Sequence, residues 1–172
     1  MIRDVEIRYE DGTIAKRVVF IQPGMRYSIT KALVHSLMLD SYFASLDYSI
    51  KEYITQKILS DVKGRMLEDI VLLEISNRKQ KGFLTFKYFF MQGGEYDLVS
   101  FNVFEKTLDL FEIKHSKEVA FDNQTKYLTN EGMTNKIQEQ FGIIKGRYVL
   151  YRGEDKDVDN IHYLNVENYL LR

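Results

Sequence analysis

The sequence has no cysteine, only one proline and no long apolar run. Without cysteine the chain cannot form disulfides, thiolate zinc sites or a cysteine nucleophile, and this composition fits a reducing compartment. Its longest apolar runs, such as 18–21 and 70–73, are far shorter than the roughly 20 residues of a membrane-spanning helix. The first residues also lack the apolar core of a signal peptide. We therefore expect a soluble, cytoplasmic protein without a membrane segment.

The chain also lacks an excess of charge of either sign. Lysine and arginine contribute 24 residues and aspartate and glutamate 25, so the formal net charge is −1. No global positive field draws such a chain onto nucleic acid, and any contact with DNA or RNA must come from local patches or from a partner chain. The sequence has no G-x-x-x-x-G-K-[ST] motif either, so it offers no P-loop for ATP.

What the sequence does contain is enough apolar material for one main folded unit. Apolar residues make up 45% of the chain, and 172 residues can bury a substantial core. Alternating segments on both sides of Asp11-Gly12 predict a β-hairpin, which Pro23-Gly24 ends. Apolar residues at helical spacing then predict a helix from Ser28 to about Leu46 and a long or bent helix from about Tyr48 to Asn77, with an interruption at Gly64.

Three strand-like runs follow, at 83–90, 95–103 and 107–114, and they predict an antiparallel meander. A helical segment with a break near Asn130 leads to another strand at RYVLYRG, so a crossover connection is expected. The last segments predict a charged loop, GEDKDVDN, a short strand, IHYL, and a final turn of helix capped by Asn165. The predicted class is α/β, bordering on α+β, with a central mixed sheet of four or five strands flanked by helices.

Acidic residues and a lysine interrupt the meander where strand formation does not need them. If its second turn centres near Phe104 and Glu105, Asp97 pairs with a position close to Glu112, and cross-strand neighbours lie about 5 Å apart. Lys114 shares the face of Glu112 because strand side chains alternate. Two neighbouring carboxylates can bind Mg²⁺, which also keeps water ligands. The alternative is ordinary charge on a solvated strand face, because an E-x-K triplet alone occurs often by chance.

The surrounding pattern resembles the PD-(D/E)xK nuclease superfamily. The resemblance rests on an acidic residue after the Gly93-Gly94 turn, followed by a strand, a short turn and a second strand that ends in Glu112-Ile113-Lys114. The proline that gives the superfamily its name is absent from Glu95-Tyr96-Asp97. The resemblance implies a restriction-endonuclease-like core in which Asp97 and Glu112 bind the metal and Lys114 assists catalysis. It also implies further candidates on flanking helices, namely Glu68 as a metal ligand and Gln124 and Tyr127 as secondary residues.

A narrower resemblance covers most of the chain. The segments QPGMRY, GRMLEDIVLLE, GGEYDLVSF, FEIKHSK and IHYLNVENYLL resemble the C-terminal region of an uncharacterised prokaryotic family of AAA-type ATPases. It implies an extension at 1–47, formed by the hairpin and a helix, and a nuclease-like domain at 48–172. The implied partner is an upstream ATPase domain or partner chain, with an oligomer allowed. The implied function is phosphodiester hydrolysis on DNA with Mg²⁺ or Mn²⁺. The alternative is a catalytically inactive module that binds nucleic acid or protein, or regulates the ATPase.

Other candidate residues have simpler explanations. Basic clusters near 78–87 and at Lys145 and Arg147 can touch a phosphate backbone, but a solvated surface requires such residues in any case. The aspartates of GEDKDVDN lack the glycine and glutamate that a calcium-binding EF-hand loop needs. We expect both features to be solvated surface.

Overall fold

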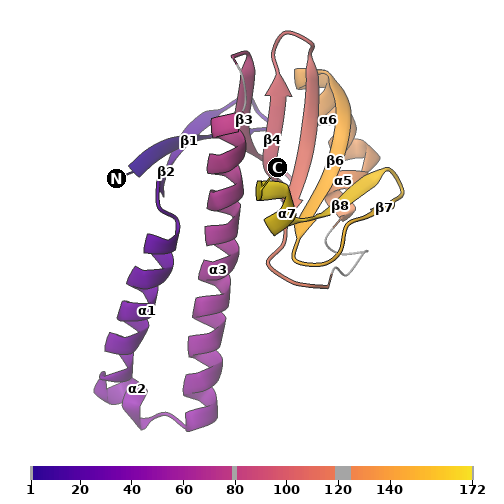
Figure 1. Cartoon of the computed structure of the whole chain (residues 1–172). Coiled ribbons are helices and arrows are strands. Elements are labelled where there is room, and N and C mark those ends of the chain that lie inside the picture. Colours follow the sequence, from indigo (N-terminus) through magenta and orange to yellow (C-terminus); the bar gives the residue numbers. More distant parts are fainter. Residues whose placement is uncertain (1, 79–80, 119–124, 172) are drawn as a thin grey trace.

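A computed structural model describes residues 2–78, 81–118 and 125–171. One mixed sheet has the strand order β2-β1-β3-β4-β5-β6-β8-β7, and helices lie against it (Figure 1). The eight strands are β1 (Ile2–Tyr9), β2 (Ile14–Phe20), β3 (Phe83–Phe89), β4 (Glu95–Asn102), β5 (Thr107–Ile113), β6 (Ile143–Tyr151), β7 (Lys156–Val158) and β8 (Ile161–Asn165). The helices are α1 (Gly24–Met38), α2 (Ser41–Ser45), α3 (Tyr48–Arg78), α5 (Lys126–Thr129), α6 (Glu131–Phe141) and α7 (Val166–Leu171). Of the described helices, none combines the length and apolar character needed to span a membrane.

The mixed α/β class and the meander are confirmed, but the predicted sheet is too small. β3, β4 and β5 pair antiparallel, and the crossover through α5 and α6 makes β6 parallel to β5. The N-terminal hairpin is continuous with this sheet because β1 pairs in parallel with β3. The division of the chain at residue 47 stays a prediction, although the hairpin before it and the meander after it share one sheet.

The segment predicted as a charged loop contributes a further strand. Lys156 to Val158 form β7, which pairs with β8, and Asp159 and Asn160 make the turn with φ angles of 50° and 61°. Two successive positive φ angles match the turn that joins tightly paired strands, and Asp and Asn tolerate them better than most residues do. The prediction of a loop is therefore wrong for Lys156 to Val158, which form a hairpin with β8 despite their charged surroundings. The Asn165 cap is confirmed, since its side chain accepts hydrogen bonds from the amides of Glu167 and Asn168.

Two apolar cores lie on opposite faces of the sheet. On one face α3 and α7 pack through residues such as Val71, Leu72 and Val166. On the other face α5 and α6 pack through Leu128 and Ile137. Central strands therefore bury both faces, as in other sheets covered by helices. These two layers fix the positions of β3, β4 and β5, which carry the candidate site.

A pair of antiparallel helices extends away from the sheet (Figure 1). We call this segment, residues 24–62, the helical arm: it comprises α1, α2 and the first half of α3. Its base is attached by Asp69 on α3, a buried carboxylate that forms ion pairs with Arg17 of β2 at 2.5 Å and with Arg26 of α1 at 2.8 Å. Burial raises the pKa of Asp69, and the two guanidinium groups oppose that rise. Asp69 therefore joins the hairpin, the arm and the long helix at one point.

Gly142, at the end of α6, allows a test of how closely the crossover from α6 to β6 packs against the turn at Lys106. Its φ is +121°, and a Cβ atom placed there would lie 2.1 Å from the carbonyl oxygen of Lys106. We expect Gly142→Ala to lower the free energy of unfolding by roughly 2–3 kcal/mol, measured by denaturant titration. Gly64→Ala is the matched control, because Gly64 is helical and has nothing within 4 Å of the new Cβ. The control should gain up to about 1 kcal/mol, and equal losses in both variants would contradict the argument.

Candidate functional site

The register of β4 and β5 places Asp97 opposite Glu112. The ladder runs from Asn102 paired with Thr107 to Leu98 paired with Phe111, so the next pair along is Asp97 and Glu112. This agrees with the register predicted from a turn centred between Phe104 and Glu105. Both carboxylates are almost completely buried, with 6% of each residue exposed. The predicted register is therefore confirmed up to Leu98 and Phe111 and puts Asp97 and Glu112 one step beyond them, and the surface alternative is wrong for these two buried residues.

Asp97 and Lys114 link the two strands beyond the end of that ladder. The Asp97 carboxylate accepts a hydrogen bond from the Ile113 amide at 2.8 Å. Lys114 places its Nζ atom 2.5 Å from Oε1 of Glu112, and its own amide donates to Leu150 of β6. The three residues predicted as the core of the site therefore lie together at the end of β5.

A β-bulge brings an additional residue, Lys87, to this site. Phe86 pairs with Val99 and Tyr88 with Tyr96, so two residues of β4, Asp97 and Leu98, stand opposite Lys87 alone. Such a bulge changes the direction of nearby side chains and is common beside functional sites. The prediction that Lys87 belongs to a solvated surface is wrong, because only 7% of the residue is exposed. The sequence offers no signal for this burial, because a lysine that alternates with the apolar residues Phe86 and Tyr88 also fits an exposed strand face.

The Lys87 ammonium group lies among three carboxylates. Its Nζ atom is 2.9 Å from Glu95, 3.2 Å from Glu68 and 3.5 Å from Asp97. Glu68 extends from α3, so the predicted helix-borne acidic residue does reach the site, with Lys87 as its direct partner. Glu95 was not among the predicted site residues. The sequence could have indicated Glu95, because it lies two residues before Asp97 and therefore on the same face of β4.

The two central carboxylates hold protons more strongly than free side chains do. Burial raises the pKa of Asp97 to about 6, and the charge of Glu68 adds to the rise, against Lys87, Lys114 and the Ile113 amide. Burial and the charge of Asp97 raise the pKa of Glu112 to about 8, against the attraction of Lys114. The Oε2 atom of Glu112 is buried without a hydrogen-bond partner. Glu112 is therefore mainly protonated at neutral pH.

The two lysines keep their charge despite burial. Burial alone would lower the pKa of Lys87, but Asp97, Glu68 and Glu95 outweigh it and raise the pKa. Burial opposes the charge of Lys114 in the same way, and Glu112 and Asp97 raise its pKa above the usual value. Both side chains are therefore fixed ammonium groups, suited to stabilising negative charge and unsuited to accepting a proton.

The donor set fits a divalent cation in part. Asp97 and Glu112 supply two neighbouring carboxylates, and Mg²⁺ is often held by one or two carboxylates with water completing the shell. The unpartnered Oε2 atom of Glu112 is a buried acceptor that a cation would satisfy. Glu68 does not complete a three-carboxylate cluster, and no group of three or more acidic, histidine or cysteine side chains suited to a metal occurs within 2–78, 81–118 and 125–171. Lys87 takes the position between Glu68 and Asp97.

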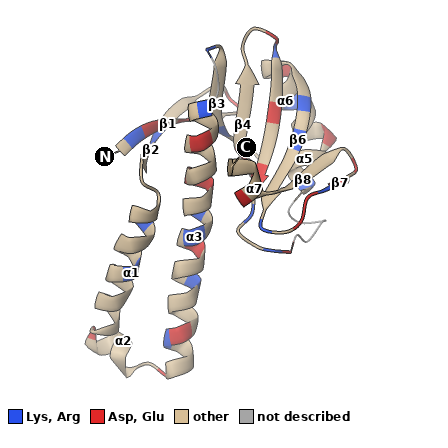
Figure 2. Cartoon of the chain, in the orientation of Figure 1, with Lys and Arg blue, Asp and Glu red and all other residues tan. Residues whose placement is uncertain are grey.

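The remaining candidates lie around this centre or away from it. Tyr127 of α5 lies against Gly94 with its ring, and its carbonyl accepts a hydrogen bond from Tyr96. Gln124 falls outside the described residues. Lys145 is exposed, whereas Arg147 is half-buried and donates to the Leu128 carbonyl. Positive and negative residues are interspersed over the molecule, without a wholly basic face in this view (Figure 2).

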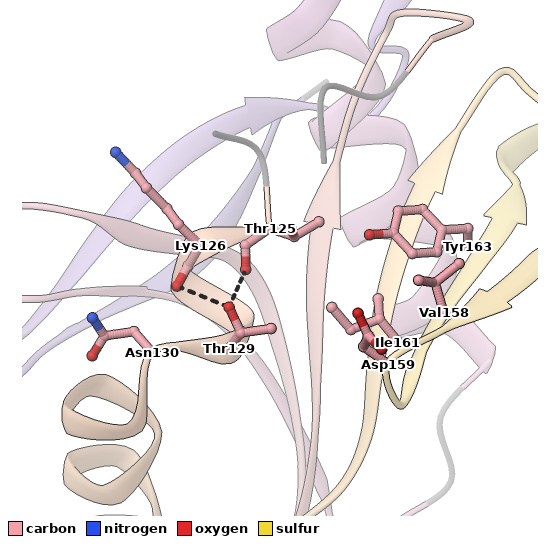
Figure 3. Close-up of a pocket in the computed structure, with 8 residues that line it drawn as sticks. All are labelled: Thr125, Lys126, Thr129, Asn130, Val158, Asp159, Ile161 and Tyr163. Atoms are coloured by element: carbon pink, nitrogen blue, oxygen red, sulfur yellow. Dashed lines mark hydrogen bonds between the residues drawn. The ribbon is translucent and has the colours of Figure 1, made fainter. Parts of the chain in front are cut away.

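A separate pocket of about 410 Å³ lies between α5 and the β7–β8 hairpin. In Figure 3 Thr125, Lys126 and Thr129 stand on one side, and Tyr163 and Ile161 stand on the other. None of the residues that line it belongs to the carboxylate and lysine cluster. The Thr129 hydroxyl is already used in weak hydrogen bonds to the carbonyls of its own helical turn. Within the described residues, the pocket is therefore separate from the cluster formed by β3, β4, β5 and Glu68 of α3.

Comparison of the chain with protein-family models, curated proteins and solved structures gave no match. The assignment of a function consequently depends on the geometry of the cluster itself.

The raised pKa of Glu112 predicts how stability varies with pH. A carboxyl group that binds its proton more tightly when folded stabilises the protein fully below its unfolded pKa of 4.5. That stability is lost as the pH rises toward the folded value of about 8. We therefore expect Glu112→Gln to gain on the order of 3 kcal/mol relative to wild type between pH 5 and pH 9, measured by denaturant unfolding.

Glu139→Gln on the exposed surface of α6 is the control, and its stability should follow wild type at every pH. A difference between Glu112→Gln and wild type that does not change with pH would show that Glu112 is ionised throughout this range.

Proposed function

We propose that this chain carries a metal-dependent phosphodiesterase site of the PD-(D/E)xK type, on a restriction-endonuclease-like core, with DNA as substrate. The observation that carries the proposal is the convergence of the buried carboxylates Asp97 and Glu112 with Lys114, which contacts Glu112, where β4 and β5 stop pairing. Burying two carboxylates costs free energy that a purely structural role would avoid. Raised pKa values in such a cluster are typical of functional sites.

Each residue has a role that follows from its contacts. Asp97 and Glu112 would hold Mg²⁺ or Mn²⁺, and the Ile113 amide fixes the orientation of Asp97. A bound divalent cation would polarise the phosphate and lower the pKa of a coordinated water molecule. Lys114 is a charged ammonium, so it would stabilise negative charge on the phosphate and orient the attacking water. Glu112 must release its proton before it binds a cation, so affinity should rise with pH up to about 8.

The sequence has no P-loop motif, and its net charge is −1. An upstream ATPase domain or partner chain would therefore deliver any work from ATP and would help to hold the nucleic acid. A near-neutral chain gains little from long-range steering toward a polyanion. Cleavage by the chain alone should accordingly be slow and sensitive to salt.

The direct test is cleavage of labelled DNA with Mn²⁺ or Mg²⁺. Wild type should cleave, and Asp97→Asn and Lys114→Met should each lose on the order of 100-fold in rate, because metal binding or charge stabilisation is removed. Circular dichroism must show that both variants fold. Glu139→Gln should retain the wild-type rate, since it changes one exposed carboxylate of α6. Equal rates in all four proteins would assign the cleavage to a contaminant.

One observation favours a second candidate, an inactive module that keeps the fold for binding or regulation. Lys87 already forms ion pairs with Glu68, Glu95 and Asp97, so three of the four carboxylates share one permanent positive charge. In a site that uses a divalent cation, this ammonium group competes with the cation for Asp97. In an inactive module, it takes the place that a cation would otherwise occupy among the carboxylates.

Lys87→Met separates the two candidates by Mn²⁺ titration calorimetry. If the site binds metal, loss of the competing charge should tighten Mn²⁺ binding by roughly tenfold, about 1.4 kcal/mol. If the cluster is only structural, neither protein should bind Mn²⁺, and Lys87→Met should lower the free energy of unfolding by about 3 kcal/mol or more. Lys81→Met, at an exposed position before β3, is the control and should change neither quantity.

A further inference from the structure

The helical arm has almost no core of its own. Among its residues only Val34 and Phe43 are buried, whereas the buried residues of α3 begin at Asp69, beyond the arm. A helix of the length of α1 spans about 22 Å and is marginally stable without tertiary packing. The arm therefore buries much less than two paired helices normally do.

Apolar side chains are instead exposed on the arm and around its base. Eleven of the nineteen large apolar side chains exposed among the described residues lie between Ile21 and Tyr53. On α1 they form a stripe at intervals of four residues, so that they share one side of the helix. Near the tip Leu39, Tyr42 and Tyr48 are exposed by 76–77%. The stripe consists of Met25, Ile29, Leu33 and Leu37.

We propose that this surface is covered by the arm of a second copy of the chain, in a two-fold four-helix bundle. Two antiparallel helices from each copy suffice for such a bundle, and a two-fold axis makes the interface self-complementary and closed. The arm extends away from the sheet, so pairing through it leaves the carboxylate and lysine cluster of each copy accessible (Figure 1).

The charge of the arm favours a second copy over other occupants. Residues 24–62 contain four basic residues and four acidic residues, so their net charge is zero. The basic excess lies in α1, which has Arg26 and Lys31 but no acidic residue, and the acidic excess lies in 39–62. Two copies side by side can therefore bring unlike charges together. A nucleic acid or an anionic membrane would require a net positive surface.

The available area is sufficient. Specific interfaces bury about 800 Å² on each partner. Tyr42, Tyr48 and Tyr53 are exposed by 65–77%, and since an aromatic side chain buries about 150–250 Å², these three tyrosines alone supply roughly 400 Å². The α1 stripe supplies most of the remainder. No new segment is needed to reach the size of a stable interface.

The test is the molar mass of the full chain by light scattering after size exclusion. At about 50 µM we expect roughly 41 kDa, twice the 20.3 kDa of one chain. Leu33→Glu places a charge in the stripe and should reduce the mass to one chain, with an unchanged circular dichroism spectrum. Leu171→Glu is the matched control, because Leu171 is 86% exposed on α7, and it should remain a dimer. A monomeric wild type, or a Leu33→Glu protein that stays dimeric, overturns the proposal.

The absence of native cysteine allows a second measurement that does not depend on a disruptive charge. A flexible bis-maleimide should join Leu33→Cys chains into a covalent dimer and leave Leu171→Cys chains single. Equal yields from the two variants overturn the arm as the interface. Binding of a monomer to anionic vesicles through Leu33 would overturn it in favour of a lipid surface.

Discussion

Lys87 extends its ammonium group into a space bounded by Glu68, Glu95 and Asp97, and this contact unites α3, β3 and β4. Removing so many charges from water is tolerable only when each has a partner nearby. The β-bulge opposite Lys87 and the hydrogen bond from the Ile113 amide to Asp97 supply that arrangement. The ends of three strands and one helix are thus fixed by electrostatics as much as by apolar packing.

The neighbouring pair, Glu112 and Lys114, is less completely satisfied. One oxygen of Glu112 is buried without a partner, and the carboxyl group keeps its proton into the neutral range. The cluster consequently has two parts, one in which three carboxylates share the ammonium group of Lys87 and one in which an oxygen of Glu112 has no partner.

The sequence contained much of this arrangement, for reasons that particular residues make clear. The β4–β5 register followed from the turn position, since antiparallel pairing is symmetrical about its turn and Asp97 and Glu112 are equally distant from it. The crossover to β6 followed from the helical segment between two strands.

The β-bulge between β3 and β4 could not be predicted, because Asp97 and Leu98 do not differ in pattern from the residues of a regular strand. Lys87 was misplaced for the same reason: a charged residue in a strand has no signature that distinguishes burial among carboxylates from exposure. The joining of the first hairpin to the sheet depends on β1 meeting β3 across more than seventy residues, which local patterns do not encode.

The helix α3 has a mechanical consequence. Its 31 residues form one element, about 46 Å long, with the exposed tyrosines near one end and Glu68 and Asp69 toward the other. Helices bend sharply only at particular residues, and within α3 Gly64 is the one without a side chain to resist it. Gly64 lies between the helical arm and Glu68, so a tilt imposed on the arm can be absorbed by bending at this residue before it reaches the carboxylate that contacts Lys87. The residue at position 64 therefore determines how closely the direction of the helical arm is coupled to the position of Glu68.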